Sequence, residues 1–163
     1  MPQKPFFTGL KACNAKTYSE LFSEEKEMIA KLKKTFLMVA GAAVQKFGPD
    51  LEQHQQLLVA AADILIEIYM AESAILRTEK NAKRFGEDAQ SAQIAMSKLY
   101  LYHAVETIEK KGKESIISFA EGDEQRMMLM GLKRFTKYQN YPDIVDLRNE
   151  IAEKIKEENK YCF

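Results

Sequence analysis

The sequence predicts an all-α protein: an antiparallel four-helix bundle with an additional C-terminal helix. Three observations favour this fold class. A length of 163 residues suits a single domain. A composition of 46% hydrophobic and 29% charged residues is too apolar for a disordered chain. The chain has only 7 Gly and 4 Pro, which is fewer turn residues than a β-sandwich or a doubly wound α/β domain of this size normally needs.

The first segment, residues 1–16, is predicted to be a linker, and residues 17–163 are predicted to form one helical bundle domain. Prolines and a glycine interrupt any periodicity in the linker. Phe6 and Phe7 need cover, so we expect the linker to dock on something larger. Cys13 and Cys162 belong to no C-x-x-C motif and are interpreted as free thiols in a reducing compartment.

Two long helices are predicted in the first half of the domain. The first spans about 23–47 and has one apolar stripe: Ile29, Leu32, Phe36, Val39, Ala43 and Phe47. Gly48 and Pro49 are expected to stop it. The second spans about 50–85 and is apolar nearly all round between residues 57 and 69, which predicts a central place in the bundle.

Three further helices are predicted after Gly86. The third spans about 89–110, with Asp88 as its cap and Gly112 closing it. The fourth spans about 124–138 behind a cap at Asp123. The last begins at 141–143, with Pro142 in its first turn, and an inner face is expected at Ile144, Leu147, Ile151 and Ile155.

Composition and missing motifs argue against several functional classes. The 24 basic and 24 acidic residues give zero formal net charge, which does not fit a nucleic-acid binder driven by a global basic field. Three carboxylates in the most apolar stretch, 57–76, argue against a membrane-spanning helix. The sequence has no G-x-G-x-x-G or G-x-x-x-x-G-K-[ST] loop for a phosphate and no G-x-S-x-G motif.

Metal chemistry of the di-iron type is not expected either. A ferritin-like site needs two E-x-x-H pairs, and neither His54 nor His103 follows a glutamate by three positions. His103 is expected to be packed or half-exposed. We therefore assign no catalytic, cofactor-binding or metal-binding residue to this segment.

Asp63 and Glu67 lie four residues apart in the most apolar helix and allow two interpretations. They form either a catalytic carboxylate pair with raised pKa values or a structural polar network. We favour the network, because a buried acid without a partner would cost several kcal/mol. Its expected partners are Arg126, Arg134 and Arg148.

Met127, Met128 and Met130 form a second notable cluster, beside the basic residues Lys133 and Arg134. Such a helix packs into the core with its lysines in water, which we favour, or lies on an anionic membrane.

Four segments carry a family resemblance. They read AADILIEIYMAESAILR (61–77), AEGDEQR (120–126), LKRFT (132–136) and LRNEIA (147–152). Residues 23–155 as a whole resemble the C-terminal helical extension of acyl-CoA dehydrogenases of the very-long-chain type. In that family the flavin, the acyl-CoA pocket and the catalytic glutamate belong to an upstream core. The resemblance thus implies an excised C-terminal piece, with residues 1–16 as a connector or the end of that core.

The resemblance implies a non-catalytic assembly domain of an FAD-dependent enzyme for fatty acid β-oxidation. We expect no cofactor in this segment and FAD in the parent enzyme. The expected partners are the upstream core and a second copy in a homodimer, with a membrane surface as a further candidate. The expected location is the cytoplasm or the surface of the inner membrane. The alternatives are a free-standing helical adaptor that binds a protein or a membrane through its Met-rich helix, and a small enzyme using Asp63 and Glu67.

Overall fold

The computed structural model describes residues 20–159. Residues 1–19, with the predicted linker, its two phenylalanines and Cys13, and residues 160–163, with Cys162, lie outside the described residues. The described part contains five α-helices and three short 3₁₀ helices. The predicted all-α class and the predicted number of five α-helices are confirmed.

The first helical hairpin follows the predicted pattern, with a shorter second helix. A 3₁₀ turn, η1 (Glu20–Phe22), leads into α1 (Ser23–Phe47), whose bounds match the prediction. Gly48 has φ 51°, a conformation that glycine adopts without strain. The chain then forms a second 3₁₀ helix, η2 (Gly48–Gln53), before α2 (Gln55–Phe85). Pro49 is compatible with the first turn of this 3₁₀ helix. Because the 3₁₀ helix occupies the residues up to Gln53, α2 begins five residues later than expected.

The third helix is longer than predicted. After η3 (Asp88–Gln90), α3 runs over Ser91–Phe119, so Gly112 lies inside the helix and does not close it. The predicted cap at Asp88 is wrong too, because Gln90 occupies the N-cap position. A Cβ atom at Gly112 would lie 3.0 Å from Cδ1 of Leu132, so this glycine lets the fourth helix approach closely.

The last two helices are short. Helix α4 spans Gly122–Thr136 and begins after Glu121, so the predicted cap at Asp123 is wrong; Asp123 lies in the first turn. Helix α5 spans Ile144–Glu158. The Asp143 carboxylate caps it by accepting hydrogen bonds from the amides of Val145 (3.0 Å) and Asp146 (3.1 Å). Pro142 precedes this cap and is not in the first turn.

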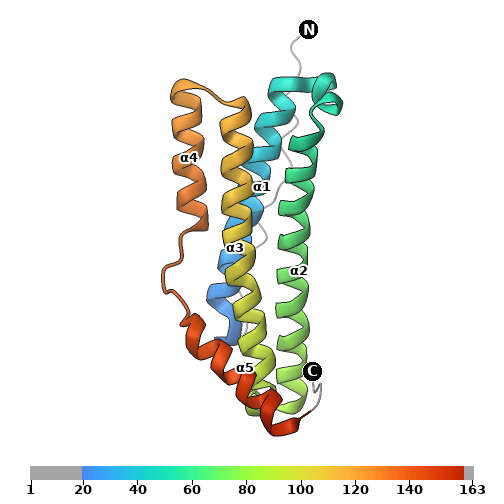
Figure 1. Cartoon of the computed structure of the whole chain (residues 1–163), viewed down its shortest axis with the longest axis vertical. Coiled ribbons are helices and arrows are strands. Elements are labelled where there is room, and N and C mark those ends of the chain that lie inside the picture. Colours follow the sequence, from blue (N-terminus) through green and yellow to red (C-terminus); the bar gives the residue numbers. More distant parts are fainter. Residues whose placement is uncertain (1–19, 160–163) are drawn as a thin grey trace.

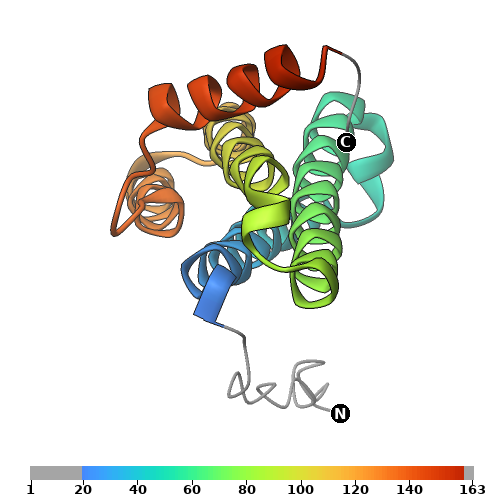
Figure 2. The ribbon, with the colours of Figure 1, turned by 90° about the horizontal axis from the view of Figure 1, so that it is seen from below.

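Helices α1 to α4 run up and down as an antiparallel bundle, and α5 is the additional helix (Figure 1). Viewed from the end, α1, α2 and α3 occupy the corners of a triangle (Figure 2). Helix α4 packs on α1 and α3, and α5 packs across α3. Neither α4 nor α5 contacts α2 among the described elements.

Two apolar clusters form the core. The larger one joins η1, α1, α2 and α3 through residues such as Leu32, Ile64 and Ile108. The smaller one joins the end of α1 to α3 and α4 through Val39, Ile116 and Leu132. The apolar stripe predicted for the first helix therefore supplies one side of both clusters.

The predicted central place of α2 is wrong. One side of α2 is buried, through residues that include Ile64, Ile68, Ala71 and Ile75. Its opposite side carries large apolar residues that remain exposed: Leu58, Val59, Leu65, Ile66, Tyr69, Met70 and Leu76. We call this set the outer α2 face. Residues 57–69 are apolar nearly all round the helix, but no described helix covers the outer side.

Candidate functional site

The two acids singled out by the sequence lie on the side of α2 that borders α3. The Lys111 ammonium lies 3.0 Å from the Asp63 carboxylate, and both side chains are about one-third exposed, at 34% and 39%. The Tyr100 hydroxyl donates a 2.9 Å hydrogen bond to Glu67. Both partners come from α3. The hydrogen bond and the charge of Asp63 raise the pKa of Lys111.

The expected arginine partners are replaced by Lys111 and Tyr100. Arg126 and Arg134 are exposed on α4 and Arg148 is exposed on α5. Because α2 contacts neither helix, these guanidinium groups lie away from Asp63 and Glu67. Arg148 instead hydrogen-bonds Nε2 of His103 at 3.3 Å, and so links α5 to α3. His103 is half-exposed, as the sequence suggested.

Burial and the contact with Glu67 both raise the pKa of Tyr100. Burial raises the pKa of Tyr100 to about 12, with the hydrogen bond to Glu67 and the negative charge of Glu67 adding to the shift. The hydrogen bond between Tyr100 and Glu67 is a contact between α3 and α2.

The most buried acid is one that the sequence analysis missed. Glu79 on α2 lies 2.6 Å from the ammonium of Lys26 on α1 and 2.8 Å from that of Lys83. The side chains of Glu79 and Lys26 are only 9% and 10% exposed. Seven residues away on each helix, Lys33 pairs with Glu72 at 2.6 Å. The matched seven-residue spacing of these lysines and glutamates is the signal in the sequence that could have revealed the two ion pairs. We call the pairs Lys26–Glu79 and Lys33–Glu72 the ladder between α1 and α2.

Two hollows lie at opposite ends of the bundle. One, of about 170 Å³, lies between α1, α3 and the α4–α5 connection and is lined in part by Glu25, Lys98 and Tyr138. The buried Tyr138 hydroxyl has no hydrogen-bond partner among the described residues, and burial raises its pKa. The other is an open groove at the η2 end, where the rings of His54 and Phe47 stack with centroids 3.8 Å apart.

Neither hollow gathers a recognisable catalytic set. Within residues 20–159, no group of three or more His, Cys, Asp or Glu side chains is placed to hold a metal ion. Lys46 in the groove donates a hydrogen bond to the Phe119 carbonyl. This bond links the C-terminal end of α1 to the C-terminal end of α3.

The Met-rich helix divides its methionines between core and solvent. Met128 and Leu132 are buried in the smaller core cluster. Met127 and Met130 are exposed, on the same side of α4 as the exposed cations Arg126, Lys133 and Arg134. The expected packing into the core therefore applies to one side of the helix only.

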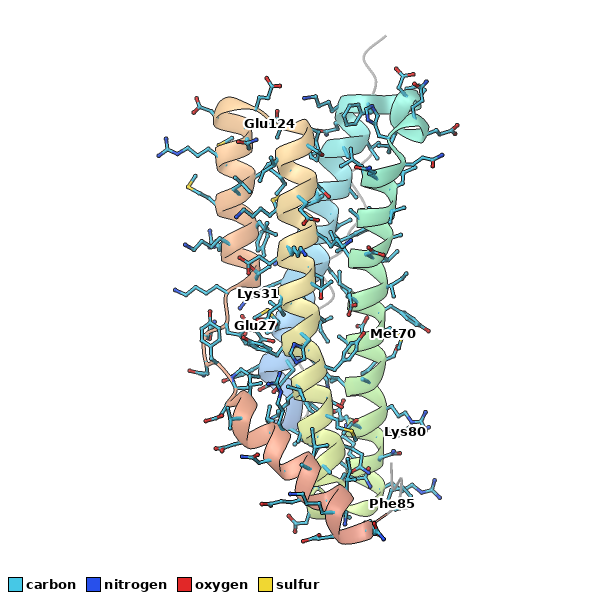
Figure 3. All side chains as sticks on the ribbon, viewed as in Figure 1. Glu27, Lys31, Met70, Lys80, Phe85 and Glu124 are labelled. Atoms are coloured by element: carbon cyan, nitrogen blue, oxygen red, sulfur yellow. The ribbon has the colours of Figure 1, made fainter. Side chains whose placement is uncertain are left out.

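The described helices leave the outer α2 face uncovered. Its side chains are about half exposed, and Tyr69 reaches 67%. In Figure 3, the labelled Met70 projects from α2 on the side away from α3 and α4. Among the described helices, none has the length and hydropathy that crossing a bilayer requires.

Comparisons with known proteins point to one family. Residues 31–134 match the model of the family described as acyl-CoA dehydrogenase, C-terminal domain. A probable acyl-CoA dehydrogenase from Bacillus subtilis is 35% identical over 143 residues, which is 88% of this chain and 24% of that protein. A crystal structure of an acyl-CoA dehydrogenase complexed with FAD, from Bacillus anthracis, superposes with a TM-score of 0.84 at 36% identity. That match covers 90% of this chain and 25% of the other, so the chain spans about a quarter of the length of these relatives.

Proposed function

Because this chain belongs to the acyl-CoA dehydrogenase C-terminal domain family, we propose that it is the non-catalytic assembly domain of an FAD-dependent acyl-CoA dehydrogenase. The observation that carries the proposal is the match of most of this chain to only a quarter of each relative. The remaining three-quarters of such a protein provides room for a catalytic core in the same chain.

The reaction proposed for the parent enzyme is the α,β-dehydrogenation of fatty acyl-CoA thioesters during β-oxidation. We assign FAD to the preceding core because this sequence has neither common phosphate-cradling loop. FAD would accept the electrons there, and the bundle would support that core from outside. The resemblance to the very-long-chain type extends this proposal to long acyl substrates.

The test compares the 163-residue chain with the full-length polypeptide, in which this domain follows the catalytic core. We expect flavin absorbance and acyl-CoA oxidation with the full-length polypeptide only. Stoichiometric flavin in the 163-residue chain would contradict the assignment of FAD to the core. A full-length protein without acyl-CoA oxidation would contradict the proposed parent activity.

We further propose that the domain shapes a homodimer of the parent enzyme. The exposed apolar side chains of α1, Leu37 and Val44, support this, because exposed apolar surface is typical of interaction sites. Sedimentation velocity of the full-length enzyme, with and without residues 17–163, measures the effect. An assembly state that does not change on deletion would contradict a role in dimer formation.

The exposed side of α4 supports a cytoplasmic domain that associates with the inner membrane. Met127 and Met130 would enter the lipid interface, and Lys133 and Arg134 would attract anionic headgroups. Co-sedimentation with phosphatidylglycerol vesicles should be lost in the Lys133→Glu/Arg134→Glu double variant. The Lys80→Glu variant on α2 is the control. Absence of wild-type binding at low salt would contradict the membrane role.

A further inference from the structure

The outer α2 face is a continuous apolar surface. Its residues form two rows with spacings of four or seven positions, 58, 65, 69 and 76 in one row and 59, 66 and 70 in the other, which keeps them on one side of the helix. At 1.5 Å per residue the face is about 27 Å long. The three acids in this stretch have partners on neighbouring helices and leave the face largely uncharged: Asp63 pairs with Lys111 and Glu67 with Tyr100 on α3, and Glu72 pairs with Lys33 on α1.

The other long helices of the bundle already have outer partners. Helix α4 lies against α1 and α3, and α5 lies across α3, whereas neither contacts α2. The face is therefore the one long apolar side that the described helices leave uncovered. A helix that is apolar all round is typical of a position with partners on every side.

We propose that the outer α2 face docks on the catalytic core of the same polypeptide. The inference rests on the proposed function and adds to it the surface that makes the contact. The family is a C-terminal domain and the relatives are about four times as long as this chain, so a large body accompanies the bundle in them. A covalently joined partner has an effective concentration in the millimolar range, which favours it over a free second copy.

Thiol labelling tests the contact. In a background with Cys13→Ser and Cys162→Ser, single cysteines replace Ile66 or Met70 on the face, which are 57% and 48% exposed. The matched control is Met130→Cys on α4, at a position that is 58% exposed. Labelling rates with a neutral maleimide are compared in the 163-residue chain and in the full-length enzyme, together with flavin content and acyl-CoA oxidation.

We expect cysteines at 66 and 70 to react at least about tenfold more slowly in the full-length enzyme, as burial in an interface requires. The cysteine at 130 should differ by less than about twofold, because α4 lies outside the proposed contact. Equal rates at 66 and 70 in both proteins would overturn the docking inference. If that full-length protein still carries FAD and oxidises acyl-CoA, the proposed function stands; if it does neither, the proposed function fails separately.

Two other occupants of the face give distinct results. Protection in the 163-residue chain that increases with protein concentration identifies a second copy and overturns the proposal. Protection that is independent of concentration, and lost in a version beginning at Thr17, identifies residues 1–16 as the occupant and also overturns it.

Discussion

Glu79 shows how a single buried carboxylate connects two helices. It lies between Lys26 of α1 and Lys83 of its own helix, with almost no exposed surface. Without the Glu79 carboxylate, the Lys26 ammonium would still pay the cost of burial away from water. It would lose the attraction to Glu79 that offsets this cost. The pair should therefore matter far more to stability than the exposed ion pairs of the same bundle.

We expect Glu79→Ala to lower the free energy of unfolding by about 3 kcal/mol. The matched control is Glu72→Ala, which breaks the more exposed pair with Lys33 and should cost less than about 1 kcal/mol. Urea denaturation of both variants measures the difference. Equal losses would show that burial of the Lys26–Glu79 pair has no special weight.

Tyr100 provides a stability change at alkaline pH. Its pKa of about 12 in the folded chain lies above its ordinary value, so the neutral form stabilises the fold. This contribution is complete below about pH 10 and is lost as the pH rises towards 12. Tyr100→Phe should cost about 1 kcal/mol at neutral pH, from the lost hydrogen bond to Glu67.

The difference in unfolding free energy between wild type and Tyr100→Phe should therefore shrink between pH 10 and 12. Chemical denaturation over this range measures it, and tyrosinate absorbance should show one late-titrating group missing in the variant. A difference that stays constant with pH would rule out the coupling to Glu67.

The partners of Asp63 and Glu67 were the least predictable part of the site. The sequence indicates that acids in an apolar helix need polar partners, but not which helices become neighbours. Arg126, Arg134 and Arg148 were plausible only while α2 was assumed to be central. In the structure, α3 is the helix beside the side of α2 that carries Asp63 and Glu67. Lys111 and Tyr100 of α3 are therefore the groups within reach of these acids.

At the scale of elements, Gly112 illustrates why a glycine misled the prediction. A glycine after an apolar stripe commonly ends a helix. Here tertiary packing decides instead, because Leu132 of α4 occupies the space that a side chain at 112 would need. The bounds of α1 were predictable because Gly48 and Pro49 act locally, whereas the extension of α3 depends on a helix that follows it.

We expect opposite effects from alanine at two helical glycines. Gly41→Ala should stabilise the chain by about 0.5–1 kcal/mol, since alanine is the better helix former and nothing lies within 4 Å of the new Cβ. Gly112→Ala should destabilise it by about 1 kcal/mol, because the buried Leu132 side chain has little room to move. Thermal unfolding compares the two, and a gain at both positions would show that Leu132 adjusts freely.

At the scale of the whole molecule, the bundle has a covered side and an open side. The sequence revealed the apolar character of residues 57–69, and from it we expected burial. It did not reveal that the described helices supply no partner for that side, because a pattern of apolar residues records burial without naming what buries them. The prediction that α2 is central therefore fails at the outer α2 face, where the described residues provide no neighbouring helix.

We expect Ile66→Glu to change the unfolding free energy of the 163-residue chain by less than about 0.5 kcal/mol, as is usual for exposed positions, while raising its solubility. The control is Ile68→Glu, two residues along the same helix and 2% exposed, where a buried charge should cost more than about 4 kcal/mol. Urea denaturation and light scattering measure both effects. A similar loss at both positions would mean that the chain itself covers the face.

The ladder between α1 and α2 also fixes how far one helix can slide along the other. Lys26 and Lys33 face Glu79 and Glu72, and one heptad further along the lysines give way to Ala40 and the glutamates to Leu65. A shift of one heptad would retain a single ion pair and place a charged group beside an apolar neighbour. The apolar stripes specify this register less sharply, because apolar residues recur with the helix period along both helices. The two ion pairs therefore favour the observed register of α1 against α2 over a register shifted by one heptad.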